Sequence, residues 1–351
     1  MLEAKLSRKW FKGATALALS TLVHCSSATQ NTEIIQVKNS TANSRVIPRD
    51  RHEICFEIER NKTKFSLCSE GITLNDLDYI ADVKSFAQKE FGLHKTSNYI
   101  SFREDPRTLH RLVVTSTNSF SLNVPFKNKY ELEGNYCKLT PPFKIDSEVD
   151  NFKDEKECYQ KKGYDVYLKT VTGIGHGSDI GKEFKDSHLA RRVELIFHED
   201  FHQTDQEIGN SLMNISLQES RAQWVGLAGA IKYFKERGDY DNQQTAITLY
   251  ENWKEQAKRV NNIFEALEQL DKLNQEEGLT KGEEERINRF MKGTNMAELH
   301  ERRSYTKYFV ILDEIYQKTG HDHKKMMEII FHTPKEEETA QKYLTKLRDL
   351  L

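Results

Sequence analysis

The 351-residue sequence predicts an α+β fold in which a small N-terminal sheet precedes a mostly helical C-terminal half. Three observations predict this class. Between residues 51 and 186, short apolar runs alternate with polar residues in the way typical of strands. From residue 187 to residue 351, apolar residues recur at helical spacing. Within the first of these helices, two histidines stand at positions i and i+4 and therefore share one face.

The N-terminal segment has the pattern of a signal peptide, which we assign to residues 1–28. Basic residues up to Lys12 precede an apolar run, residues 14–23, that is too short to span a bilayer. Cleavage after Ala28 suits an ordinary signal peptidase, whereas the residues leading to Cys25 resemble a lipoprotein box, in which lipid is attached to that cysteine. We therefore expect an exported protein, either in the periplasm of a Gram-negative bacterium or anchored to its membrane through Cys25.

Residues 29–50 are polar and rich in Thr, Asn and Ser, which predicts a flexible tether. Residues 51–186 then predict an α+β subdomain. It begins with a hairpin, because apolar residues alternate in 54–58 and 65–67 on either side of a turn. The further elements expected there are a helix, three strands and a glycine-rich turn, at 75–91, 112–117, 119–124, 164–172 and 173–177.

Cysteine usage agrees with export. Apart from Cys25, the chain has four cysteines, an even number that favours disulfides in an oxidising compartment. The predicted hairpin brings Cys55 opposite Cys68, which leaves Cys137 to pair with Cys158. Four cysteines allow three connectivities, and the sequence alone does not choose among them.

Residues 187–351 predict a helical subdomain. Its first helix has Asp186 or Ser187 as a candidate N-cap and ends near Gly209. The second runs over about residues 217–234. Further helices are expected at 246–273, 281–291, 297–318 and 324–331.

The first of these helices contains the motif HExxH at residues 198–202. On a helix, the imidazoles of His198 and His202 can reach one metal ion, and Glu199 can hydrogen-bond a water held by that ion. Two imidazole nitrogens with an adjacent carboxylate are the groups that zinc-dependent hydrolysis of an amide requires. The motif therefore predicts a site for one Zn²⁺ and metallopeptidase activity.

A zinc site needs a third protein ligand from outside this helix, because three ligands along one straight helix cannot be tetrahedral. Glu219 on the following helix is our candidate. The competing interpretation is a capping box over residues 216–219, in which Glu219 bonds back to the amide of Ser216. The spacing leaves both roles open.

The segment 192–203 resembles the core of the predicted aminopeptidase family of bacterial zinc metallopeptidases. The resemblance covers about residues 90–345 of the chain. It implies a gluzincin-like fold, one zinc ion, a peptide or protein substrate and aminopeptidase activity. Three further segments resemble the family: its strand before the catalytic helix at 163–167, its N-E-S-x-A segment at 218–222, and its C-terminal region at 295–299 with Tyr305.

Two features depart from the family pattern. Family members carry small or apolar residues inside the motif, whereas this chain has the charged Asp200. On a helix Asp200 points away from both histidines, so we expect it to disturb packing and not metal binding. The chain also lacks the Gly-Ala-Met-Glu-Asn segment with which well-studied aminopeptidases hold a substrate's amino terminus. Aminopeptidase action is therefore implied by the family alone.

A short sheet followed by paired helices that carry HExxH and a glutamate matches the zincin arrangement. In that arrangement the strand beside the active helix, here 164–172, pairs with extended substrate. We expect His198, His202 and Glu219 to hold Zn²⁺. Glu199 would accept a proton from the attacking water and pass it to the leaving amine.

The oxyanion that develops during hydrolysis needs a second donor besides the metal. Tyr305 is our candidate for this catalytic role, with Tyr308 and His176 as alternatives. Gln203 and Asn214 are close enough in sequence to orient the metal-binding histidines.

Three functional interpretations follow from these observations. The first is an exported zinc aminopeptidase, and the second is an endopeptidase that acts on envelope proteins or peptidoglycan peptides. The third is a catalytically inactive binding lipoprotein with a zincin fold, which the charge at Asp200 and the hydrophilic helical half favour. The net charge of −2 excludes the basic footprint of a nucleic-acid-binding protein.

Overall fold

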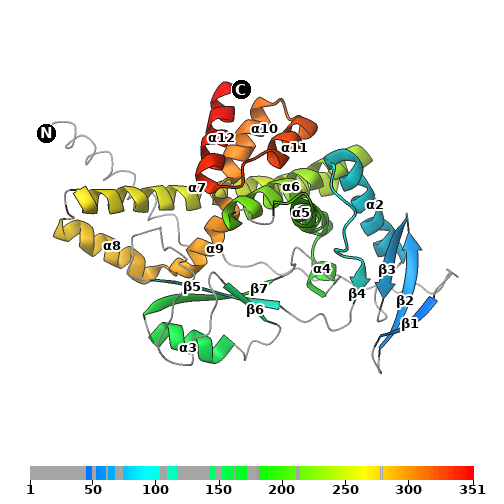
Figure 1. The fold of residues 1–351 in the computed structure, drawn as a ribbon, viewed down its shortest axis with the longest axis horizontal. Coiled ribbons are helices and arrows are strands. Elements are labelled where there is room, and N and C mark those ends of the chain that lie inside the picture. The colour runs from blue at the N-terminus through cyan, green and yellow to red at the C-terminus, as the bar shows by residue number, and fades with distance from the viewer. Residues whose placement is uncertain are drawn as a thin grey trace.

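The computed structural model describes residues 45–49, 53–60, 62–67, 74–102, 109–116, 143–146, 152–161, 163–171, 180, 182–210, 214–276, 278 and 280–351. Two small sheets lie along the lower and right-hand sides of the molecule in Figure 1, and helices form the rest of its body. Helices make up most of the described chain. At this coarse level the structure agrees with the α+β class.

The first sheet contains the predicted hairpin. Its strand order is β1-β2-β3-β4, with bounds Arg45–Arg49, Glu53–Arg60, Thr63–Leu67 and Ser101–Phe102. Strands β2 and β3 pair antiparallel with Phe56 opposite Leu67, which confirms the hairpin. Cys68 lies outside the described residues, so its pairing with Cys55 stays a prediction.

The assignment of residues 29–50 to a flexible tether is wrong at its C-terminal end. Strand β1 pairs antiparallel with β2 along its whole length, with Val46 opposite Phe56. Val46 and Ile47 are β-branched residues that suit an extended backbone, but the polar composition of the surrounding window hides them. Residues 29–44 lie outside the described part of the chain.

The second sheet is antiparallel and has the order β6-β5-β7. Its strands are Phe143–Asp146, Leu109–Ser116 and Tyr164–Val171. Strands β5 and β7 confirm the strands expected at 112–117 and 164–172. The third expected strand, 119–124, and the turn at 173–177 lie outside the described residues. Strand β7 forms one edge of this sheet as described.

Helix α3, Lys153–Lys161, packs against the second sheet. The side chains that form this small core are Leu112, Phe152, Tyr159 and Val166. Cys158 on α3 is disulfide-bonded. Cys137, its predicted partner, lies outside the described residues, so that pairing stays a prediction.

The helical body confirms the helices expected at 75–91, 246–273, 281–291 and 324–331, with bounds that differ by up to six residues. The last helix, α12, lies within the region 187–351 that was expected to be helical, although its own range was not among those named. The candidate site lies on α5 (Leu189–Glu207) and α6 (Ile215–Arg237). The other helices of this body are α2 (Leu74–Phe91), α4 (Lys182–Asp186), α7 (Tyr240–Glu276), α8 (Lys281–Gly293), α9 (Met296–Thr306), α10 (Phe309–Lys318), α11 (His323–Phe331) and α12 (Glu337–Leu350).

The prediction of one helix over 297–318 is wrong, because the chain breaks between α9 and α10. Side chains from other helices replace hydrogen bonds of the helix at this break. Asn261 of α7 donates its amide to the carbonyls of Thr306 and Lys307, at 3.2 and 3.3 Å. Ser220 of α6 accepts the backbone N–H of Tyr308 at 3.2 Å. Such partners come from distant parts of the chain, so helical periodicity does not reveal them.

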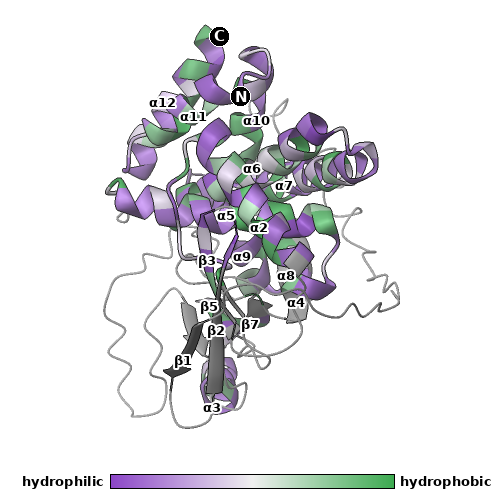
Figure 2. Ribbon diagram, turned by 90° about the vertical axis from the view of Figure 1, so that its right-hand side faces the viewer, coloured by the Kyte–Doolittle hydropathy of each residue, from purple (hydrophilic) through white to green (hydrophobic). Residues whose placement is uncertain are grey.

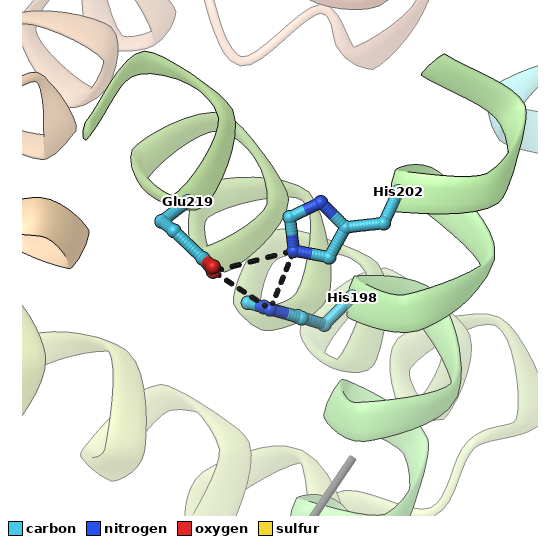
Figure 3. A group of neighbouring side chains, drawn as sticks. All are labelled: His198, His202 and Glu219. Atoms are coloured by element: carbon cyan, nitrogen blue, oxygen red, sulfur yellow. Dashed lines mark hydrogen bonds and ion pairs between the residues drawn. The ribbon is translucent and has the colours of Figure 1, made fainter. Parts of the chain in front are cut away.

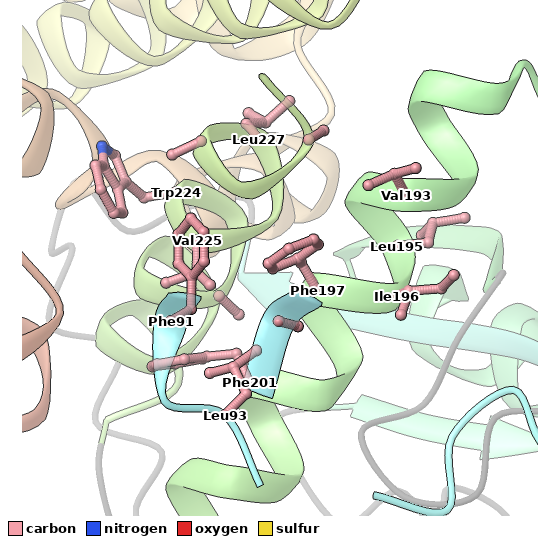
Figure 4. Packing of buried hydrophobic residues seen from close by; sticks show 14 of the residues in the cluster. Phe91, Leu93, Val193, Leu195, Ile196, Phe197, Phe201, Trp224, Val225 and Leu227 are labelled. Carbon is pink, nitrogen blue, oxygen red and sulfur yellow. The ribbon is translucent and has the colours of Figure 1, made fainter. Parts of the chain in front are cut away.

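The centre of the body is the contact between α5 (Leu189–Glu207) and α6 (Ile215–Arg237). Figure 4 shows apolar side chains of both helices packed together there. Two glycines of α6 allow the close approach: a Cβ on Gly226 would lie 2.8 Å from the carbonyl oxygen of Glu194, and one on Gly229 would lie 2.5 Å from the ring of Phe197. Any larger residue at either position would push the two helices apart.

The described helices carry both hydrophobic and hydrophilic residues along their length (Figure 2). Within the described residues, none of the helices combines the length and the apolar character that a membrane crossing requires.

We expect Gly229→Ala to lower the free energy of unfolding by about 1–3 kcal/mol, because the added methyl group overlaps the Phe197 ring. Gly282→Ala in α8 is the matched control, since nothing lies within 4 Å of the position that its added methyl group would take. The control should be neutral or stabilising by up to about 1 kcal/mol. Urea denaturation followed by circular dichroism measures both, and equal stability of the two variants would contradict the close contact.

Candidate metal centre

The HExxH motif lies on α5, whose side chains are mostly buried. The N-cap of this helix is His188, not Asp186 or Ser187 as expected. The ring nitrogen Nδ1 of His188 accepts the backbone N–H of Ala190 at 3.2 Å. Asp186 instead ends the short helix α4 that precedes α5.

Three side chains converge between α5 and α6 (Figure 3). His198 and His202 come from successive turns of α5, and Glu219 comes from the first turns of α6. The two Nε2 atoms are 3.1 Å apart. Oε2 of Glu219 lies 3.3 Å from Nε2 of His202 and 3.5 Å from Nε2 of His198. The structure thus brings together the three residues that the sequence selected as metal ligands.

The triangle of these three atoms fits a zinc ion. Ligand atoms about 2.0–2.1 Å from a tetrahedral zinc lie about 3.3–3.4 Å from one another, close to the three separations here. Two imidazoles and one carboxylate are also a ligand set that catalytic zinc sites use, with the fourth position left open. The side chain of His202 is 17% exposed, whereas those of His198 and Glu219 are 8% exposed, so the centre faces solvent on the His202 side.

The interpretation of Glu219 as part of a capping box is wrong. Asn214 caps α6, and its side-chain oxygen accepts the backbone N–H of Ser216 at 2.8 Å. The helix therefore begins one residue before Ser216, and the carboxylate of Glu219 is left to face the histidines. Asn214, two residues before Ser216, is a favourable N-cap residue, and its presence in the sequence distinguishes the two interpretations.

The two histidines keep the carboxyl group of Glu219 deprotonated. Burial by itself raises the pKa of this carboxyl, but His202 and His198 outweigh that effect and hold the pKa well below its usual range. Burial also raises the pKa of Glu199, which His198 and His202 oppose only in part. The two glutamates therefore differ in their proton affinity although they lie at one site.

Glu199 directly follows His198 on α5. Its side chain is buried, with 5% exposure, and its Oε2 atom has no hydrogen-bond partner within the described residues. Its backbone carbonyl accepts the side-chain amide of Asn98 at 2.8 Å, which ties this turn of α5 to the segment after α2. A buried carboxylate oxygen without a protein partner fits a group that bonds a water molecule.

Asp200 points away from the histidines as expected, but it does not disturb the packing. It is fully buried against Lys84 of α2, whose ammonium contacts both carboxylate oxygens at 2.8 and 2.9 Å. Thr96 donates a hydrogen bond to the same carboxylate. A lysine among the apolar positions of the helix expected at 75–91 was the signal for this partner.

A second buried ion pair joins the two helices that carry the ligands. Arg221 of α6 is fully buried and pairs with Asp205 of α5. Asp205 stands three positions after His202, and Arg221 stands two positions after Glu219. The pair therefore fixes the spacing of the helices next to the metal ligands.

Tyr305 of α9 lies beside the ligands. Its ring stacks on that of His198, with centroids 6.3 Å apart and planes 25° from parallel. Loss of solvent raises the pKa of its phenol well above the usual value, and the charge of Glu219 raises it further, so the hydroxyl keeps its proton at neutral pH. Tyr308 instead donates to Glu337 at 3.3 Å, away from the centre, and His176 lies outside the described residues.

The residues expected to orient the histidines do not contact them. The amide of Asn214 donates to Glu337, and Gln203 bonds Ser97 and Glu207 at the surface. Sequence reasoning also missed three residues next to Tyr305 that carry charge: Arg111 on β5, Lys169 on β7 and Glu301 on α9. No motif connects them, because they come together only when the second sheet packs against α9.

We expect the mature protein from residue 29 to bind about one equivalent of zinc, and His202→Ala to weaken zinc binding by more than about 100-fold. The loss follows because two ligand atoms cannot complete the site. His94→Ala is the matched control, since it removes a half-exposed imidazole that pairs with Glu207 at the surface. Isothermal titration with zinc measures both variants, and equal affinity would rule out His202 as a ligand.

Comparison with family models, with curated proteins and with solved structures finds no match to this chain.

Proposed function

We propose that this protein is an exported zinc metallopeptidase with a zincin-like fold, as the resemblance to the predicted aminopeptidase family implies. The observation that carries the proposal is the triangle of His198, His202 and Glu219, with Glu199 directly after His198 on α5. These residues stand at the positions to which the HExxH mechanism assigns the two histidine ligands, the third ligand and the general base.

The residues of the centre divide the chemistry among them. Zinc held by His198, His202 and Glu219 would supply a Lewis acid and lower the pKa of a water to about 7. Glu199 would accept a proton from the water that attacks the scissile carbonyl and would pass it to the leaving amine. The hydroxyl of Tyr305 donates a hydrogen bond to the carbonyl oxygen as negative charge develops on it.

Arg111 supports this role of Tyr305. Its guanidinium donates to the tyrosine oxygen at 3.4 Å, so an acceptor site of the phenol is occupied and its proton is directed elsewhere. The stacking on His198 keeps the ring next to a metal ligand. Both contacts hold the hydroxyl in one orientation before substrate arrives.

Strand β7 is the proposed docking edge for an extended peptide. Asn295 donates to the carbonyl of Val166 at 3.0 Å, so this residue turns its backbone groups away from β5. Backbone groups alternate sides along a strand, and therefore Leu168 and Thr170 also direct theirs outward. An extended substrate can add to the sheet at these positions.

The proposed compartment is the periplasm or the outer face of a membrane, reached by the signal peptide or through lipid on Cys25. The disulfide at Cys158 supports an oxidising compartment. Peptides with free and with blocked amino termini separate the two proposed modes of cleavage, since an aminopeptidase needs the free amine and an endopeptidase does not.

We expect Glu199→Gln to lower kcat/KM for peptide hydrolysis by at least about 100-fold, because the amide cannot accept the proton of the attacking water. Zinc content should stay at about one equivalent, since Glu199 is not a ligand. Glu207→Gln, at an exposed position of the same helix, is the control. Undiminished hydrolysis by Glu199→Gln would contradict the mechanism, and a zinc-loaded parent that cleaves no peptide would favour a binding protein.

We expect Tyr305→Phe to lower kcat by about 10²–10³-fold with little change in KM, because the lost hydrogen bond forms in the transition state. Tyr308→Phe is the matched control, since that hydroxyl bonds Glu337 outside the centre. Steady-state kinetics on both variants checks this. A Tyr305→Phe enzyme as active as the control would remove Tyr305 from the mechanism.

A further inference from the structure

Tyr99 has a buried hydroxyl group that no protein group binds. The residue lies between α2 and β4, and its side chain is fully buried. Within the described part of the chain, its hydroxyl has no hydrogen-bond partner. Buried tyrosine hydroxyls usually find a partner, because an unpaired donor keeps the whole cost of leaving water. The hydroxyl of Tyr99 therefore calls for a partner that the protein itself does not supply.

The backbone of Tyr99 is held in a conformation that side chains rarely adopt. Its φ angle is 53°, in the left-handed region that favours glycine. The amide of Asn98, the preceding residue, donates to the carbonyl of Glu199 at 2.8 Å, and the carbonyl of Asn98 accepts the ammonium of Lys84 at 3.0 Å. The ring of Tyr99 stacks on that of Phe184, with centroids 4.7 Å apart. These contacts impose the strained conformation and hold Tyr99 beside the turn of α5 that carries Glu199.

Among the charged groups, the carboxylate of Glu199 acts most strongly on Tyr99. Loss of solvent raises the pKa of the Tyr99 phenol well above its usual value, and the charge of Glu199 raises it further. The phenol thus keeps its proton and can donate it in a hydrogen bond. Glu199 is buried as well, and its Oε2 atom has no hydrogen-bond partner within the described residues. A buried donor and a buried acceptor, each without a protein partner, therefore interact across α5 and the segment before β4.

We propose that the hydroxyl of Tyr99 donates to an ordered water, that this water donates to the carboxylate of Glu199, and that the link holds the carboxylate in one orientation. Buried waters typically bond polar groups that lack other partners. A carboxylate has about four acceptor sites on its two oxygens, so Glu199 can accept this bond and still bind the attacking water. The inference rests on the proposed function, because Glu199 is the proposed general base. Tyr99 acts through Glu199 and is a positioning residue.

The first experiment is a double-mutant cycle on the zinc-loaded mature protein that combines Tyr99→Phe with Glu199→Met. Tyr99→Phe removes the hydroxyl and keeps the stacked ring, and Glu199→Met removes both acceptor oxygens at similar volume. Urea denaturation at one zinc concentration gives the unfolding equilibrium constant of all four proteins. We expect Tyr99→Phe to raise this constant at least about fivefold in the parent and less than about twofold in Glu199→Met.

Tyr79→Phe is the matched control. Tyr79 lies on α2, and its hydroxyl oxygen is also buried without a hydrogen-bond partner in the described part of the chain. Burial and the neighbouring Tyr233 act most strongly on its phenol. The control should therefore change the unfolding equilibrium constant by the same factor in the parent and in Glu199→Met. A Tyr99→Phe protein as stable as the parent, or a change of equal size in both backgrounds, would overturn the inference.

Peptide hydrolysis supplies a reading that a purely structural role of Tyr99 would not change. We expect Tyr99→Phe, with one equivalent of zinc and well below its unfolding midpoint, to lower kcat about tenfold with KM unchanged. The reason is that the base loses its orientation, whereas substrate binding does not use the link. Tyr79→Phe should keep the kcat of the parent. An unchanged kcat in Tyr99→Phe would overturn the positioning role.

The two experiments separate this inference from the proposed function. Coupling between Tyr99 and Glu199 in a parent that cleaves no peptide would contradict the peptidase and leave the link between the two residues standing. Hydrolysis by the parent without any such coupling would do the reverse. The kinetic comparison does not use Glu199→Met, so it tests the positioning role even where that variant does not fold.

Discussion

The close contact of α5 with α6 is the constraint on which the rest of the structure depends. HExxH offers two candidate ligands on one helix, and no arrangement of that helix alone can add a third in tetrahedral position. Gly226 and Gly229 remove the side chains that would keep α6 at a distance, and Glu219 then lies on the turn that faces both histidines. The centre thus requires glycine at positions 226 and 229, because a Cβ atom at either would keep the two helices apart.

Buried charge fixes the position of α5 from two directions. Lys84 binds Asp200 on the side of the helix away from His198 and His202, and Arg221 binds Asp205 toward its C-terminal end. Each pair carries a large desolvation penalty that only good geometry offsets, so a rotation or slide of α5 would expose a charge to an apolar core without its partner. The motif helix is therefore held in one register although the side chain of His202 on its other face is partly exposed.

The sequence predicted more of the candidate site than of the fold. Spacing identified His198 and His202 as candidate metal ligands and made Glu219 the candidate for a third, with the capping box as the one local alternative. Asn214 resolves that alternative, and it is visible in the sequence. The sequence could not predict the helix break at Tyr308, because the side chains that stabilise it come from α6 and α7. It could not predict the contact of Arg111 with Glu301 either, because that contact joins the second sheet to α9. Contacts between elements distant in the chain leave no periodic signal.

Helix α9 is fastened at both of its ends. At its start the carboxylate of Asp165 accepts the backbone N–H of Met296, and Asn295 bonds the same strand. At its end Ser220, the neighbour of Glu219, accepts the N–H of Tyr308. Helix α9 thus connects strand β7 at the edge of the second sheet with helix α6, which carries Glu219. A peptide that tilted β7 on docking would transmit the movement through α9, so Tyr305 and the surroundings of Glu219 would respond together to occupancy of that edge.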